Sequence, residues 1–481
     1  MYKGISLRGA LLAATALACG AGYAAAADLT HFTAGDIVID TTAGDTDNAA
    51  SLIALKEFSL GAGGTSAMYQ GSLTLPQTAS GANSAISGEY GSSSEGFLQL
   101  STNGKLLTIG GYGVNAAYYN ANAALYGNAS LAQTTSLLNQ PYITVPRVVA
   151  AIGGNGQVDT STALTGVFNT NNIRSVTTVD GSSFYVSGQG ASKTDSATQG
   201  VFLAKDGATT ATGIDNTTDT RVVEIINGKL YVSRDRKPSS GANNSTNIST
   251  LTAPGGGLPT SSAGLVTTRI IPGAASTQGG NTASIDLTAA TANGVNNSRI
   301  GKFVYLSPEE YFLASPDVMY VTDSGFPKNG NANAAALGDG GLQKWVLEDN
   351  VWTLEYTLYQ GLDLVNNATG GNANSEPGVT GLLGLTAQVV GGDVELFVTT
   401  YGLNDLSPDY LYEITDSLGA TSGAGESFNL LYTASAGEQI GGVSFAPSVP
   451  EASTWVLLGI GFAGVGCAAF RRSRKIQAAN A

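Results

Sequence analysis

The chain has 481 residues, only 12% of them charged, and its 22 basic and 36 acidic side chains give a net charge of −14. His31 is the single histidine, so mechanisms that need two histidine side chains are excluded. Cys19 and Cys467 both lie in apolar terminal segments that we expect to be removed. The mature protein would then have no thiol for a disulfide, a zinc site or a nucleophile.

The charge imbalance is larger in the body of the chain than in the whole. Without the two terminal segments, residues 28–450 keep 16 basic and 35 acidic side chains, a net charge of −19. A body this acidic repels nucleic acid and anionic lipid. We therefore expect no nucleic-acid partner.

Residues 1–27 have the three parts of a secretory signal peptide. A positively charged start is followed by an apolar stretch over residues 9–18, and Ala25 to Ala27 provide a small-residue cleavage site. We expect signal peptidase to cut between Ala27 and Asp28. The competing interpretation is a lipoprotein box ending at Cys19, which is weaker because Ala16 stands where that pattern has a large aliphatic residue.

The body is predicted to consist of β-hairpins. Three strand–turn–strand patterns turn at Asn-Gly or Asp-Gly, residue pairs that tolerate the positive φ angles of a type I′ turn. Three weaker hairpins follow further along the chain, and no amphipathic helix longer than two turns is evident. The expected turns are at Asn103-Gly104, Asp180-Gly181, Asn227-Gly228, Pro316-Asp317, Asp349-Asn350 and Gly391-Gly392.

The spacing of these hairpins favours an all-β fold, a β-propeller. Similar hairpins centre on residues 103, 180, 227, 316 and 391, at intervals close to one or two multiples of the ~40–45 residues of a four-stranded blade. Residues 28–448 would then form about seven blades, with residues 238–299 as a long excursion between two of them. A β-sandwich and a β-helix remain alternatives, although a β-helix needs a shorter repeat.

Carboxylates are the only candidates for catalytic side chains. Two of them could converge as in a glycosidase, but the sequence gives no sign of convergence, and solvated strand or loop positions are the favoured interpretation. We therefore predict no catalytic residue. The acids in question are Glu309, Glu310, Glu355 and Glu395.

Metal and sugar sites receive equally weak support. Asp45, Asp47, Asn48 and Asp339 offer oxygen ligands without the spacing of a calcium loop, so turns are favoured and no metal or cofactor is predicted. Trp345 and Trp352 flank a turn, and one of them could stack on a sugar ring. Packing between blades is the commoner role for such residues. We expect His31 to be a surface or first-strand residue.

The C-terminal segment, residues 449–475, has three successive parts. Val449, Pro450 and Glu451 precede an apolar run over residues 454–470, whose 17 residues give a helix of about 25 Å that barely spans a bilayer. A basic cluster follows and would stay in the cytoplasm, which holds the body outside. The cluster consists of Arg471, Arg472, Arg474 and Lys475.

This tail closely resembles the PEP-CTERM sorting signal of Gram-negative bacteria. Pro450 and Glu451 match the first two motif positions, and Ala452 stands where a second proline is usual. The resemblance implies that exosortase recognises the tail, near Pro450-Glu451, after transient anchoring in the inner membrane. The alternative is an ordinary C-terminal anchor helix, but the motif, the length of the apolar run and the arginine pair together favour a sorting signal.

The body also resembles a group of PEP-CTERM proteins of uncharacterised function. The matching stretches begin at Ser94, Asn171, Gly341 and Gly441, and the resemblance implies a propeller-like secreted body that leads directly into the sorting tail. It implies no activity, cofactor or site.

Two classes of function follow. The favoured one is a non-enzymatic protein of the cell envelope or extracellular matrix, sorted by exosortase and displayed or released with exopolysaccharide. The alternative is a secreted propeller enzyme that acts on polysaccharide through paired carboxylates. Carboxylates at the mouth of the central channel would favour the enzyme, and a channel lined by Ser, Thr and apolar residues would favour the matrix protein.

Overall fold

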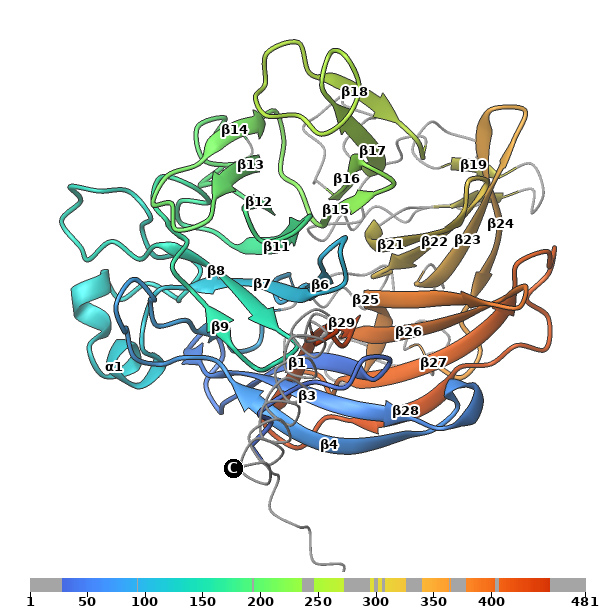
Figure 1. Cartoon of the computed structure of the whole chain (residues 1–481), viewed down its shortest axis with the longest axis horizontal. Coiled ribbons are helices and arrows are strands. Elements are labelled where there is room, and N and C mark those ends of the chain that lie inside the picture. The colour runs from blue at the N-terminus through green and yellow to red at the C-terminus, as the bar shows by residue number, and fades with distance from the viewer. Residues whose placement is uncertain are drawn as a thin grey trace, which may run out of the picture.

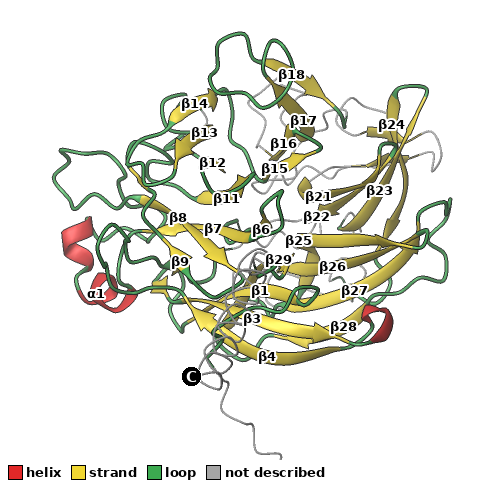
Figure 2. Ribbon diagram, viewed as in Figure 1, coloured by secondary structure: helices red, strands yellow, loops and turns green. Residues whose placement is uncertain are grey.

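The computed structural model describes residues 28–449 apart from 93, 193, 236–245, 272–294, 298–301, 305–307, 326–339, 363, 365–377 and 403–405. Within these ranges the chain forms six β-sheets arranged as blades around a central axis, an all-β propeller (Figure 1). Among these described residues, helix is confined to three short segments (Figure 2): α1 (Ala116–Ala121) and the 3-10 turns η1 (Ala62–Gly64) and η2 (Ala123–Tyr126). The signal segment 1–27 and the tail helix 454–470 lie outside the described residues.

The blades follow one another along the chain, and each runs from an inner strand at the axis to an outer strand. Blade 1 contains β29 (Glu438–Phe445), β1 (Ile37–Ala43), β3 (Ile53–Leu60) and β4 (Ala67–Thr74). Blade 2 contains β6 (Gln99–Leu100), β7 (Leu106–Tyr112), β8 (Arg147–Gly153) and β10 (Ala163–Leu164), with β9 (Val158–Asp159) also paired to β8. Blade 3 contains β11 (Ile173–Thr178), β12 (Ser183–Gly188), β13 (Gly200–Lys205) and β14 (Thr212–Asp215).

Blades 4 to 6 repeat this order. Blade 4 contains β15 (Val223–Ile226), β16 (Lys229–Asp235), β17 (Thr246–Thr252) and β18 (Val266–Arg269). Blade 5 contains β21 (Pro308–Ser315), β22 (Val318–Asp323), β23 (Gly341–Glu348) and β24 (Val351–Leu358). Blade 6 contains β25 (Val379–Val390), β26 (Asp393–Gly402), β27 (Tyr410–Ser417) and β28 (Asn429–Thr433). Two small ribbons pair β2 (Ala50–Ser51) with β5 (Gly88–Glu89), and β19 (Val295–Asn297) with β20 (Lys302–Val304).

The two ends of the body close the ring. The last strand, β29, is antiparallel to the first, β1, over a register from Ile37 opposite Phe445 to Ala43 opposite Glu438. Blade 1 thus takes its inner strand from the C-terminal end of the body and its three other strands from the N-terminal end. A two-stranded hairpin cannot bury its apolar face alone, so each blade needs neighbours to pack against. The closure gives blade 1 a neighbour on each side, as the other blades have.

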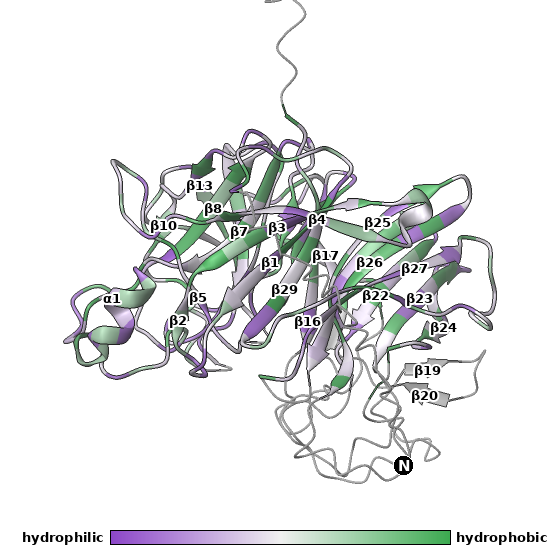
Figure 3. Cartoon of the chain, turned by 90° about the horizontal axis from the view of Figure 1, so that it is seen from below, coloured by the Kyte–Doolittle hydropathy of each residue, from purple (hydrophilic) through white to green (hydrophobic). Residues whose placement is uncertain are grey.

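The hydrophobic core is divided among the blade interfaces. Six clusters of buried apolar side chains occur in the described residues, and each draws mainly on two adjacent blades, for instance Val38 and Leu107 between blades 1 and 2. In the side view, the blade strands carry alternating hydrophobic and hydrophilic bands (Figure 3). Trp345 is fully buried between blades 4 and 5 and donates from Nε1 to Gln343, so it packs between blades as expected.

The expected blade count of about seven is wrong, and the hairpin spacing explains why. The turns at 103, 180, 227, 316 and 391 all join the first and second strands of successive blades, 2 to 6. Each interval is therefore one blade, and the long intervals contain insertions rather than extra blades. One of them, residues 113–146, holds α1 and η2 between β7 and β8.

The three Asn-Gly and Asp-Gly turns occupy equivalent positions, but they differ in conformation. Asn227 and Gly228 both have positive φ, as a type I′ turn requires, and so do Asp349 and Asn350 between β23 and β24. At the two other turns only Gly104 and Gly181 have positive φ. These loops are longer than two residues, because β6 ends at Leu100 and β11 at Thr178.

Buried cations reinforce the contacts between blades. Lys344 of blade 5 contacts Asp416 of blade 6 at 3.0 Å, and Tyr320 and Tyr356 donate to the same carboxylate. Arg234 of blade 4 contacts Asp215 of blade 3 at 2.6 Å. Buried Arg147 donates to several backbone carbonyls of the segments around it, including those of Val145, Ala132 and Phe168. Long polar side chains thus bind neighbouring segments to one another and fix their relative orientation more specifically than apolar packing alone would.

We predict that Lys344→Met lowers the free energy of unfolding by roughly 3 kcal/mol, because Asp416 stays buried without its cation. The matched control is Lys105→Met at an exposed turn, which should change it by no more than about 0.5 kcal/mol. Chemical denaturation of the two variants and the wild type tests this. Equal stabilities would show that the buried pair contributes nothing.

Candidate functional site

The tail leaves the body beside the ring closure. After β29, the backbone of Ala446 donates to Asp36, and the backbone of Ser448 donates to Gly104 of blade 2, both at 2.8 Å. Gly104 belongs to the turn between the first two strands of its blade. We call the side of the ring that carries these first turns the turn face, so the tail leaves from the turn face.

Most predicted sorting and cleavage residues lie outside the described part of the chain. Pro450, Glu451, the basic cluster, Ala25 and Ala27 are among them, whereas Val449 is the last described residue and is exposed. Asp28, the first described residue, bridges to Ser72 on blade 1. No helix in the described ranges is long and apolar enough to cross a membrane.

A central cavity of about 300 Å³ lies on the propeller axis. The inner strands of five blades line it, and each of these strands runs toward the turn face. Within one strand, a residue earlier in the sequence therefore lies deeper in the cavity, farther from the turn face. Gln99, Glu224 and Glu310 lie deep, and Thr102 and Asn227, both exposed turn residues, lie at the mouth. The remaining lining is largely apolar: Leu98, Leu100, Ile225, Ile226, Phe312, Leu313, Leu385, Ala387, Val443 and Phe445, with Tyr311, Thr386 and Ser444.

Two carboxylates share this cavity and differ in their hydrogen bonds. Glu310 is 2% exposed and accepts from the side chain of Gln99 and, at 2.6 Å, from the backbone of Leu385. Oε2 of Glu224 is buried without a hydrogen-bond partner. Burial raises the pKa of Glu224 to about 8. Burial also raises the pKa of Glu310 well above its usual range, and the nearby charge of Glu224 adds to this rise.

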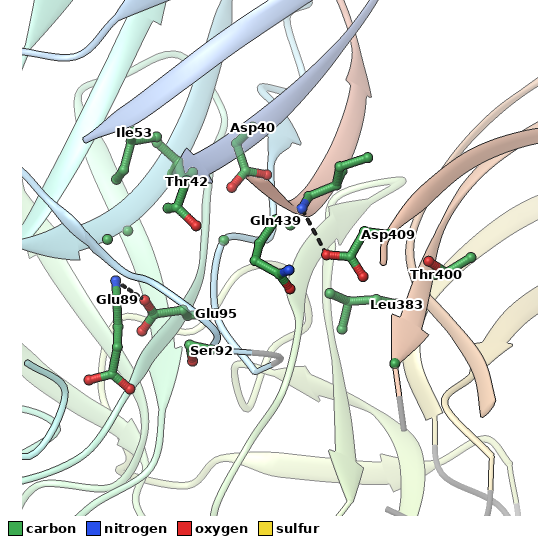
Figure 4. A pocket seen from close by; sticks show the side chains of 17 residues that line it. Asp40, Thr42, Ile53, Glu89, Ser92, Glu95, Leu383, Thr400, Asp409 and Gln439 are labelled. Carbon is green, nitrogen blue, oxygen red and sulfur yellow. Dashed lines mark hydrogen bonds between the residues drawn. The ribbon is translucent and has the colours of Figure 1, made fainter. Parts of the chain in front are cut away.

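A second acidic group lies between blades 1, 2 and 6, toward the face opposite the turn face (Figure 4). Its cavity is only about 30 Å³, and since a water molecule needs about 10–15 Å³, it has room for two or three waters and none for a sugar ring. Four carboxylates line it: Asp40, Glu89, Glu95 and Asp409.

Backbone and side-chain donors hold these four carboxylates in place. Asp40 accepts from the backbone of Gly442 at 2.5 Å, and Asp409 accepts from that of Ile440 at 3.0 Å. Glu95 accepts from the backbone of Glu89 and from the Tyr112 hydroxyl. Burial raises the pKa of Asp409 to about 8, and burial raises the pKa of Asp40 and Glu95 as well. These contacts give the group a structural role in joining β29 to its neighbours.

The four acids singled out in the sequence do not gather at one place. Glu309 and Glu310 are consecutive on β21, where its pairing with β22 is irregular, and their side chains have different partners. Glu309 contacts Arg221 at 3.7 Å and accepts from Ser324, whereas Glu310 faces the central cavity. Glu355 is buried on the outer strand β24, and Glu395, on β26, accepts from Gln388 at an exposed position.

The candidate calcium ligands form an ordinary turn. Asp45, Asp47 and Asn48 lie in a loop with Thr46 bonded to Asp45, along an open groove of about 550 Å³ beside α1. Among the described residues, no group of three or more His, Cys, Asp or Glu side chains is placed to hold a metal ion. Asp339 lies outside these residues. His31 is exposed, as expected for a surface residue.

Sequence reasoning missed the partner of Glu310. Glu224 is the one charged residue in the apolar run of β15, just before the Asn227-Gly228 turn. A charge inside such a run is unusual for a buried strand, and the position of the turn already placed that strand first in its blade. Together these two signals could have located Glu224 near the axis.

The comparisons with known proteins concern the tail and the overall fold. Residues 448–475 match the PEP-CTERM protein-sorting motif. The chain therefore carries the sorting signal of an exported exosortase substrate, as the sequence predicted, and the motif implies transient anchoring in a membrane through the C-terminus. No curated protein matches the sequence.

Several solved structures are distantly similar. A chain of a nidogen/laminin complex is 10% identical, with a TM-score of 0.36, over 86% of this chain and 100% of that one. An ancestral GH74 enzyme is 12% identical, with a TM-score of 0.33, over 85% and 48%. The β-propeller domain of the Trilobed protease from Pyrococcus furiosus is 8% identical, with a TM-score of 0.25, over 83% and 97%. Similarity this low bears on neither activity nor ligand.

The buried acids predict that stability falls as the pH rises from 5 to 8. Burial raises the folded-state pKa of Glu224 and Asp409 to about 8, above the unfolded values of roughly 4. Between about pH 4 and 8 the folded protein therefore binds more protons than the unfolded chain, and its free energy of unfolding falls as the pH rises. Glu224→Gln should make the melting temperature depend less steeply on pH. Glu395→Gln, at an exposed strand position, is the control and should leave the slope unchanged. An equal slope in all three proteins would contradict the assignment.

Proposed function

We propose that this chain is an exported, non-catalytic protein of the cell envelope or extracellular matrix that associates with exopolysaccharide. Signal peptidase removes residues 1–27, and the tail holds the body at the inner membrane on the periplasmic side. Exosortase then removes the tail near Pro450-Glu451. The supporting observation is the position of the sorting motif, which begins at residue 448, three residues after the closure strand β29 ends at Phe445.

This position allows the tail to be removed without loss of any blade. All residues of β29, and the contact of Ser448 with Gly104, precede Pro450. Cleavage there leaves the ladder between β1 and β29 complete. The released body would therefore stay folded, as a protein destined for display or release must.

The acidic body restricts which polysaccharide it could accompany. With 16 basic against 35 acidic residues over 28–450, the body repels polyanions and tolerates neutral or cationic polymers. The proposed partner is therefore a neutral or amine-bearing exopolysaccharide rather than a strongly acidic one.

The state of the axial carboxylates supports a non-catalytic role. Glycoside hydrolysis by paired carboxylates needs one protonated acid and one ionised base or nucleophile. Burial raises the pKa of both Glu224 and Glu310, which disfavours the ionised partner. The alternative, a secreted polysaccharide-active enzyme, keeps one favourable observation: these two acids share a cavity of about 300 Å³.

Incubation of the full chain, in mild detergent, with a panel of bacterial exopolysaccharides separates the two proposals. We expect co-sedimentation with neutral or cationic polymers and no shortening of their chains. Chain cleavage that disappears in Glu310→Gln and Glu224→Gln, but persists in Glu395→Gln, would establish the enzyme instead.

Sorting is tested in a host that contains exosortase. We expect mass spectrometry to find the mature C-terminus near Pro450-Glu451, and deletion of residues 454–475 to give a soluble periplasmic protein. The matched control replaces Pro450 and Glu451 by Ala and keeps the apolar run and the basic cluster, so this variant should stay membrane-bound. Intact tail peptides as the main species of the unaltered protein would contradict processing.

A further inference from the structure

We propose that the central cavity binds a small organic molecule through a primary ammonium group, held between Glu224 and Glu310. This inference goes beyond sorting and matrix association and does not depend on either. It rests on the volume of the cavity, the composition of its walls and two polar groups that lack partners.

The first observation is an excess of acceptors with no cation to meet them. Two carboxylates line the cavity, and none of its lining residues, all in the described part of the chain, is Lys, Arg or His. Two other buried acids have a cation in direct contact: Asp416 has Lys344, and Asp215 has Arg234. Buried carboxylates without a counter-charge are costly, and a cationic ligand would supply that charge.

The second observation is that two residues lining the cavity each have a buried oxygen atom with no hydrogen-bond partner. These atoms are Oε2 of Glu224 and the hydroxyl of Tyr311, a residue that is only 1% exposed and lines the same cavity. The pKa of the Tyr311 hydroxyl is raised by burial and by the charges of Glu224 and Glu310, which places the three groups in one neighbourhood. A satisfied structural network would not leave two such atoms unpaired.

An ammonium group has as many N–H donors as there are acceptor atoms for it here. It has three N–H donors and no acceptor. The acceptors available are Oε2 of Glu224, the hydroxyl oxygen of Tyr311 and a second lone pair on a carboxylate oxygen of Glu310. Each donor would then have one acceptor, and the ammonium would offset the carboxylate charge.

The volume and the walls favour an organic ligand over a bare metal ion. About 300 Å³ is the lower end of the range for small-molecule pockets and far exceeds the space of one ion. Leu98, Phe312, Leu385 and Phe445 provide apolar surface for a hydrocarbon chain or a sugar ring. A divalent ion would also lack a third acidic or imidazole ligand among the described residues.

Access is from the turn face. The exposed residues Thr102 and Asn227 are at the mouth, and both acids lie deeper, with Glu224 on β15 three residues before Asn227. An amine would therefore enter with its ammonium group first, and the rest of the molecule would lie toward the mouth. A monosaccharide unit of a longer chain could bind in this way, as could a linear diamine.

Binding should release protons, because the ammonium favours the ionised carboxylates. The pKa of Glu224 in the free protein is about 8, so affinity should rise by up to about tenfold per pH unit between pH 6 and 8. The charged and titratable groups around the pair are Asp40, which raises the pKa of Glu310, and Tyr231 and Tyr311, whose pKa values Glu224 raises. Arg234 acts on Tyr311, whose pKa it lowers.

Isothermal titration of the full chain in mild detergent tests the proposal, with glucosamine and putrescine as probes. N-acetylglucosamine, which has the same ring without the charge, is the neutral control. We expect at least one amine to bind with proton release and N-acetylglucosamine not to bind. Binding of neither amine, or equal binding of N-acetylglucosamine, would overturn the proposal.

Two variants assign the binding to this cavity. Glu224→Gln keeps nearly the same shape and should weaken amine binding at least tenfold at pH 8, and Tyr311→Phe should weaken it by a smaller factor. Glu395→Gln, far from the axis, should bind like the wild type. Amine binding that Glu224→Gln leaves unchanged, or a Glu224-dependent response to CaCl2 with none to the amines, would refute the ammonium site.

Discussion

Closure of the ring by β1 and β29 is the constraint on which the rest of the structure depends. Each blade buries its apolar side chains only against its neighbours, and the six clusters of the core therefore need six complete interfaces. The interface between blades 6 and 1 includes Ile440 and Val443 of the closure strand. Without β29 and the Ala446 that follows it, two neighbouring interfaces would lose part of their core at once.

The same constraint links the fold to sorting. Because the closure strand supplies the inner strand of blade 1, its direction brings the chain out on the turn face, beside Gly104 of blade 2. The mouth of the central cavity lies on that face as well. The insertion between β7 and β8 lies on the opposite face.

The acidic composition has a second structural consequence. A body with few basic residues places several of them at buried positions between blades, where Arg147 and Lys344 each bind acceptors from more than one segment and Arg234 binds Asp215. The central cavity has no Lys, Arg or His among its lining residues. Burial raises the pKa of both carboxylates that line it, Glu224 and Glu310.

The sequence predicted the local structure well and the global count poorly, for a physical reason. Turn chemistry depends on a few residues, so the first turns of blades 2 to 6 were all located, including Asn227-Gly228 with positive φ at both positions. The number of blades inferred from turn spacing depends on how long the loops are, and the 34-residue insertion over residues 113–146 lengthens one interval by most of a blade's length. The convergence of Glu224 and Glu310 was not predictable from spacing either, because the two residues are 86 positions apart in sequence, on inner strands that meet only at the axis.

The most direct test of this account compares the melting of two shortened proteins, residues 28–449 and residues 28–437. The first keeps the closure strand and lacks the tail, and the second also lacks β29. The account predicts that residues 28–449 melt in one cooperative transition, at the temperature measured for the body of the full chain. Residues 28–437 should fail to fold or should melt far below it. A cooperative transition at an unchanged temperature in residues 28–437 would contradict the claim that the β1–β29 ladder holds the ring together.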